Sequence, residues 1–303
     1  MMVGTLPATL LLAASFGDAF VPSSQSAAFI SFRTTTLRAS AVAEQETVGS
    51  IKKFVNWVSP RKGNREKIKQ NAFPIAAGLC FAFNSGYING CCLSGVLNSF
   101  GTGTPVSAFT GAYTNAGLAL GAGNFAGALA NFQMIGSYVT GAALSGFLNP
   151  RPVPGKITPR FGPSFLVGSA LMALSSVLAN TCPEGRAFLY FAAMANGLQN
   201  AVTSAFSANL VRTSHMTGAS SDLGMIAGQM LGGNFENLWR FSVLAILASS
   251  FLAGGAASVF AVNQFQSTAL VFSAALYGGI SVATIGFIAY QQRLSVWRAA
   301  TGQ

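Results

Sequence analysis

Three ionisable residues lie close together in an otherwise apolar part of the 303-residue chain. Arg212 and His215 precede Asp222 by ten and seven residues. Ionisable side chains at membrane depth are costly and usually face a cavity or a partner. We therefore interpret Arg212 and Asp222 as a gating pair, or as an anion-and-proton site in which His215 titrates. A structural role is the alternative, with Arg212 at the membrane interface and Asp222 capping a helix, because Ser220, Ser221 and Asp222 are typical of helix starts.

Two polar patterns in the chain recur, each with a Thr-Gly (TG) pair. At an offset of 107 residues, Thr110, Gly111, Asn115 and Gly117 correspond to Thr217, Gly218, Asp222 and Gly224. At an offset of 111, Gly86 and Asn89 correspond to Gly197 and Asn200. A duplicated unit is therefore predicted, and its paired polar residues are candidates for binding a substrate. Together with the ionisable group, the candidate site residues are Asn89, Thr110, Asn115, Asn200, Arg212, His215, Thr217 and Asp222.

Amide side chains also occur in the middle of apolar segments. They belong to Asn84, Asn89, Asn196, Gln199 and Asn200. Each could bind substrate or could form hydrogen bonds between helices of the two halves. Sequence alone leaves both roles open for each residue.

Long apolar segments must position these residues. The composition is 51% hydrophobic and 8% charged, far below the roughly 25% charged residues of soluble domains. Six long segments are predicted to be helical: 73–100, 126–148, 161–179, 187–210, 238–262 and 267–290. Two shorter segments, 107–122 and 214–231, contain the TG pairs. The predicted fold class is an all-α polytopic membrane protein with six full transmembrane helices and two short or broken TG helices, eight in all if both cross the bilayer.

Basic residues indicate the orientation of the two halves, predicted at residues 71–182 and 183–292 with a tail at 293–303. With three crossings per half, the residues from Lys52 to Lys69, the Arg151 loop, Arg212 and the Arg293 tail fall on one side, as the positive-inside rule requires. The halves would then be inverted. If the TG segments cross as well, each half has four crossings and the halves are parallel.

The first 48 residues are predicted to be a targeting sequence. Residues 1–19 have the short apolar core of a signal peptide, and residues 20–48 have the Ser-rich, acid-poor composition of a transit peptide. With Phe20 at the junction, they resemble the bipartite presequences of algae with secondary plastids. That resemblance implies a plastid membrane protein. The alternative is a secretory signal followed by a disordered stretch, with the protein in another endomembrane or the plasma membrane.

Charge and motifs exclude several other classes of protein. The net charge of +10 is concentrated before the first apolar segment, in the basic arm at 49–70, which indicates a lipid bilayer and not nucleic acid as the partner. The four cysteines, Cys80, Cys91, Cys92 and Cys182, show no metal spacing. We find no catalytic triad, phosphate-binding loop or metal motif, so we expect no enzyme activity, cofactor or metal.

The paired motifs resemble a known family. The pattern GYIN (Gly86 to Asn89), the first TG pair, GLQNA (Gly197 to Ala201) and VRTSHMTGASSDLG (Val211 to Gly224) is similar to that of the YoaK-like family of integral membrane proteins. The resemblance covers about residues 71–292 and implies a helical membrane fold without an established substrate. Two positions depart from it, because Asn89 stands where the family usually has an acid and Ala112 where it has an asparagine.

The matching polar breaks predict a transporter. Inverted halves with interrupted helices at corresponding positions are typical of proteins that move a small molecule or ion by alternating access around a central site. The alternative is a structural or assembly protein of a plastid membrane complex, which uses Gly-rich helix faces to bind partner helices. The sequence is compatible with a monomer or a homo-oligomer.

Overall fold

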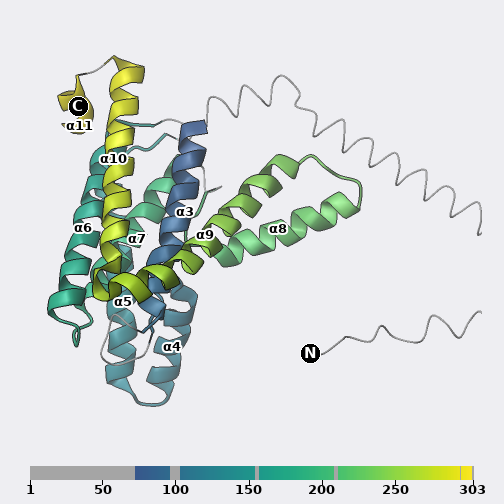
Figure 1. Ribbon diagram of the computed structural model, residues 1–303. Helices are drawn as coiled ribbons and strands as arrows, with labels where there is room; N and C mark the ends of the chain where they lie inside the picture. Colours follow the sequence, from purple (N-terminus) through teal and green to yellow (C-terminus); the bar gives the residue numbers. More distant parts are fainter. Residues whose placement is uncertain (1–71, 96–102, 154–156, 208–210, 294, 302–303) are drawn as a thin grey trace, which may run out of the picture. The chain divides into compact units, whose positions relative to one another are not determined.

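The computed structural model describes residues 72–95, 103–153, 157–207, 211–293 and 295–301. The chain divides into two units, Met1–Arg61 and Lys62–Gln303, and all described residues belong to the second. The predicted signal peptide, transit peptide and basic arm therefore lie outside the described residues. Those that are described form helices and no strand (Figure 1), which confirms the all-α fold class.

The helices follow the predicted apolar pattern. In chain order they are α3 (Ala72–Leu93), α4 (Phe109–Gly121), α5 (Phe125–Leu148), α6 (Phe161–Thr181), α7 (Ala187–Phe206), α8 (Met216–Leu231), α9 (Leu238–Phe265), the 3-10 helix η2 (Gln266–Ala269), α10 (Leu270–Gln292) and α11 (Val296–Thr301). Helices α4 and α8 are the two predicted TG segments. Helix α11, in the tail, was not predicted.

Two helices end earlier than the apolar pattern predicted. Helix α3 stops at Leu93, where Gly95 adopts a φ of 72°, a left-handed conformation that commonly terminates helices. Helix α7 stops at Phe206, and the hydroxyl of the next residue, Ser207, accepts the Val211 N–H at 2.8 Å. Such a side-chain bond competes with continuation of the helix.

Two stretches of the described chain have the length and composition of a candidate membrane span. Phe161–Thr181 and Leu238–Gln292 are long and apolar enough to cross a membrane by these criteria, and the second contains α9, η2 and α10. Helices α4 and α8 have 13 and 16 residues. Both are shorter than the roughly 20 residues that a full crossing needs.

Helices α3 and α9 cross each other (Figure 1), and two glycines allow their backbones to come very close. Gly86 on α3 faces the backbone carbonyl of Phe251, and Gly254 on α9 faces the backbone carbonyl of Phe83. A methyl group at either glycine would collide with the opposite backbone. Small residues at such positions allow close helix packing in membranes.

Helices α5 and α7 cross in the same way. Gly141 on α5 faces the backbone carbonyl of Met194, and Gly197 on α7 faces that of Tyr138. Helix α6 packs against both α7 and α10. The short helices α4 and α8 lie against α5 and α9 respectively (Figure 1).

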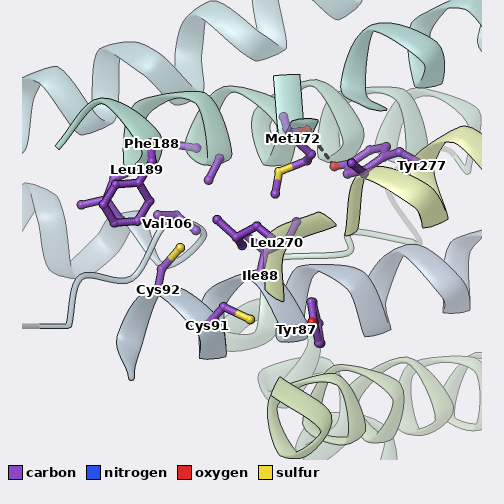
Figure 2. Packing of buried hydrophobic residues seen from close by; sticks show 14 of the residues in the cluster. Tyr87, Ile88, Cys91, Cys92, Val106, Met172, Phe188, Leu189, Leu270 and Tyr277 are labelled. Atoms are coloured by element: carbon purple, nitrogen blue, oxygen red, sulfur yellow. Dashed lines mark hydrogen bonds between the residues drawn. The ribbon is translucent and has the colours of Figure 1, made fainter. Parts of the chain in front are cut away.

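The apolar core is built where these pairs meet. It includes Ile88, Met172 and Phe188 from α3, α6 and α7, together with Leu270 from α10 (Figure 2). The Tyr277 hydroxyl, which lies in this core, donates a hydrogen bond to the Ala195 carbonyl at 3.0 Å. Cys91 and Cys92 are buried in the same core, Cys80 and Cys182 are exposed, and all four cysteines are free.

Candidate functional site

A pocket of about 580 Å³ lies between the end of α7, the segment leading into α8, and helices α8 and α9. Its volume falls within the range of roughly 300–1,000 Å³ typical of small-molecule sites. The lining residues are Ser207, Arg212, His215, Gly218, Ala219, Asp222, Trp239, Arg240, Leu244 and Leu247. The pocket therefore brings together the three predicted ionisable residues and adds Arg240.

Asp222 pairs with Arg240 rather than with Arg212. The Arg240 Nη2 donates to Asp222 Oδ2 at 2.6 Å, and the two side chains are 42% and 37% exposed. An ion pair this exposed contributes roughly 0–1 kcal/mol to folding. The predicted capping role for Asp222 is wrong, because α8 already begins at Met216 and Asp222 lies inside the helix.

Arg212 and His215 interact next to the N-terminus of α8. The Arg212 Nη1 lies 3.3 Å from His215 Nδ1. Arginine has only donors, so this is a hydrogen bond when Nδ1 accepts and the ring proton is on Nε2. The TG glycine makes room for the ring, because a Cβ at Gly218 would lie 2.8 Å from Nδ1. A larger residue at position 218 would therefore require the exposed His215 ring to shift.

The remaining walls of the pocket are of two kinds. Trp239, Leu244 and Leu247 contribute apolar surface from α9. Gly218 and Ala219 belong to the first turn of α8, whose cap residue, His215, makes no side-chain capping bond. The arrangement can hold a small molecule that has both a polar group and an apolar part.

Two predicted site residues, Asn89 and Asn200, act as anchors for the short helices. Asn89 Oδ1 accepts from the Val106 and Ser107 N–H groups at 3.0 and 3.3 Å. Asn200 Oδ1 accepts from the Ser214 N–H at 3.4 Å. Neither amide lines the pocket. Each ties a core helix to the segment that enters α4 or α8, and so acts by positioning.

The other three predicted site residues, Thr110, Asn115 and Thr217, are exposed and do not line the pocket. The two threonine carbonyls accept hydrogen bonds from the next turn of their own helices. Thr114 Oγ1 donates to Thr110 O at 3.0 Å, and Ser221 Oγ donates to Thr217 O at 3.2 Å. The structure therefore does not bring these three residues together with the ionisable group.

The buried amides of α7 form a network between helices. Gln199 Nε2 lies 2.7 Å from Ser85 Oγ and 2.9 Å from Thr213 Oγ1, and Ser85 Oγ donates to Asn196 Oδ1 at 3.1 Å. All four side chains are buried. Because Thr213 adjoins Arg212, this network holds the pocket-lining segment against the core.

Arg240 is the site residue that sequence reasoning missed. It is the only lysine or arginine between Arg212 and Arg293, and that isolation within an apolar stretch was the available signal. Among the described residues, no group of three or more His, Cys, Asp or Glu side chains could hold a metal ion.

One protein-family model matches the part of the chain that contains the pocket, the asparagine anchors and the crossing glycines. The family described as "Protein of unknown function (DUF1275)" matches residues 77–283, which is more than half of the chain. The chain belongs to this family. The DUF1275 region contains both asparagine anchors, the four crossing glycines and every pocket residue. No curated protein and no solved structure matches the chain.

Proposed function

We propose that this DUF1275 protein is an integral membrane transporter that moves a small molecule or ion by alternating access between two halves. The main observation in support of this proposal is the pocket at α8, which is lined by apolar surface and by four ionisable residues, Arg212, His215, Asp222 and Arg240. Its one hydroxyl-bearing side chain, that of Ser207, bonds to the Val211 backbone. The proposal therefore assigns binding and transport, and no enzymatic step, to this site.

The proposed membrane architecture has six crossing helices, with α4 and α8 as short additional segments. Their lengths of 13 and 16 residues favour partial insertion. Large apolar side chains on α9 and α10 support contact with lipid, since Leu252, Phe260 and Val282 are 72%, 74% and 69% exposed. A soluble surface rarely displays such side chains together.

The two-halves part of the proposal is supported by matching contacts. Gly86 and Phe83 on α3 correspond to Gly197 and Met194 on α7, each at an offset of 111 residues. Gly141 on α5 corresponds to Gly254 on α9 at an offset of 113.

Ser85 and Asn196, whose buried side chains are hydrogen-bonded to each other, are also 111 residues apart in the sequence. Equivalent residues meet in this way at the axis that relates duplicated halves. With three crossings each, the halves are inverted.

Location is proposed from the sequence alone. We assign the protein to the YoaK-like type of membrane protein and, on the presequence at residues 1–48, to a plastid membrane of an alga with a secondary plastid. Another endomembrane or the plasma membrane is the alternative. Import of a fusion carrying residues 1–48 ahead of a fluorescent protein distinguishes the plastid from those membranes.

Flux measurement tests transport directly. The full chain is reconstituted in phosphatidylcholine vesicles, and uptake of labelled acetate, inorganic phosphate, glycine and sodium is compared with that of protein-free vesicles. We expect saturable uptake of at least one solute. Absence of uptake for all four, together with stable co-purification in a larger complex, contradicts transport. That outcome favours the alternative of an assembly protein whose exposed apolar faces bind partner helices.

A further inference from the structure

We infer that the pocket at α8 binds a small oxyanion, a carboxylate or a phosphate, and that Asp222 is an internal counter-ion which this ligand displaces from Arg240. The inference rests on the proposed function, since it names the class of substrate for the same pocket.

The first argument is the balance of charge in the pocket. Arg212 and Arg240 line it together with a single carboxylate, that of Asp222. Arg240–Asp222 is the only ion pair among the described residues, so none of the described carboxylates neutralises Arg212. Arg212 Nη1 lies instead 3.3 Å from His215 Nδ1. An unneutralised guanidinium facing a pocket attracts an anion, and its planar donors match oxyanions.

The second argument is that Arg240 is incompletely used. Its Nη2 donates to Asp222, while its buried Nε has no hydrogen-bond partner. Arginine binds oxyanions best with two nitrogens at once. The existing pair is exposed on both sides and screened by water, so a ligand oxygen can replace Asp222 at little cost to the fold.

The third argument is the apolar wall. The apolar wall, formed by Trp239, Leu244 and Leu247, would contact the non-polar part of an organic acid or the part of a lipid acyl chain nearest the headgroup. The same oxyanion chemistry therefore has two sources, a soluble anion and an anionic lipid headgroup.

The test uses the opposite signs expected for the two members of the ion pair. The full chain in phosphatidylcholine nanodiscs is titrated with acetate, benzoate and inorganic phosphate by calorimetry, and in a second arm the nanodiscs contain phosphatidylglycerol. We expect Arg240→Gln to weaken binding about tenfold or more, since it removes charge-assisted donors. Asp222→Asn strengthens binding several-fold, because it removes the internal competitor while keeping the shape of the side chain.

Matched variants keep the test decisive. Arg186→Gln removes the same charge from an exposed residue outside the pocket and leaves binding unchanged. If Arg240→Gln does not fold, Arg240→Lys keeps the charge but loses the planar fork, and binding weakens. Arg212→Gln also weakens binding.

The outcomes separate this inference from transport itself. Variant-sensitive binding of a soluble anion supports it with a soluble ligand, and the same variant pattern with phosphatidylglycerol alone supports it with a lipid headgroup. Equal losses in Asp222→Asn and Arg240→Gln, or no binding in either arm, overturn it. Solute flux that is indifferent to Arg240→Gln overturns it while transport stands, and binding without flux leaves the site standing while transport fails.

Discussion

Helices α4 and α8 each begin two residues after a serine whose backbone N–H donates to an asparagine of a core helix, Ser107 to Asn89 and Ser214 to Asn200. Each short helix then lies against the core helix that follows it in the chain. Around the second helix, Arg212, His215, Asp222 and Arg240 gather in a pocket.

The corresponding positions of α4 carry none of this chemistry. Asn115, at the position of Asp222, is exposed. Gly111 corresponds to Gly218, and a methyl group added there would have no neighbour within 4 Å. The difference teaches that similar scaffolds can carry different chemistry, because the charged side chains that line the pocket at α8 have no charged counterparts on α4.

The largest expected effect concerns the part that the two regions share. Gly86→Ala and Gly197→Ala each place a methyl group against a backbone carbonyl, of Phe251 and Tyr138 respectively. We expect both to lower stability by about 1–3 kcal/mol or more. Thermal unfolding of the detergent-solubilised protein measures this. The control is Gly279→Ala on α10, which meets nothing within 4 Å. Unequal effects of the two substitutions would weaken the equivalence of the two crossings.

The asparagine anchors should differ in strength. Asn89 is buried and accepts two backbone N–H groups, whereas Asn200 is half-buried and accepts one at 3.4 Å. We expect Asn89→Ala to cost about 1–3 kcal/mol and Asn200→Ala about 1 kcal/mol. The same unfolding measurement ranks them. Asn115→Ala, an exposed position on α4, serves as the control and should be nearly neutral. A larger loss at Asn200 would show that the α8 side carries more of the stability.

The TG glycines should separate the two regions by function. Gly218→Ala forces the His215 ring to move, so we expect anion binding at the pocket to weaken several-fold, while helix propensity keeps the change in stability below about 1 kcal/mol. Gly111→Ala, its matched control on α4, should leave binding unchanged and gain up to about 1 kcal/mol from helix propensity. Calorimetric titration with acetate or phosphate compares them. Equal binding in both variants would remove His215 from the site.

The smallest expected effect is the loss of folding stability when the ion pair is removed. Asp222→Asn removes a contact that is exposed on both sides, so we expect the free energy of unfolding to fall by less than about 1 kcal/mol. Arg240→Gln should lose a similarly small amount. Unfolding of both variants beside the unmodified chain measures the difference. A loss of several kcal/mol in either would show that the pair is held for the fold and not for a ligand.

The helices could be predicted because each has a local cause. Apolar segments bounded by polar or glycine-containing stretches are visible in the sequence, and eight of them correspond to helices in the structure. Their predicted bounds agree with the observed ones within a few residues, except at the C-terminal ends of α3 and α7. Those two ends depend on Gly95 and on the Ser207 hydroxyl. A smoothly apolar sequence does not reveal such local events.

The site was harder to predict because its members come from different helices. Arg212, His215 and Asp222 are neighbours in the chain, and the structure places them in one pocket. Arg240 lies 18 residues beyond Asp222, on the next helix. Thr110, Asn115 and Thr217 were candidates because of their spacing, yet their side chains are exposed. Spacing along one helix does not show what faces that helix.

By itself, the sequence determined the helical class, the approximate helix bounds, the scarcity of charge and the isolation of Asp222, because these follow from the order and polarity of neighbouring residues. Only the tertiary structure decided that Asp222 meets Arg240, that Asn89 and Asn200 serve as anchors and that Gly218 makes room for His215. Those outcomes depend on which helices pack together. That packing is set by close glycine contacts and buried hydrogen bonds between residues more than 50 positions apart.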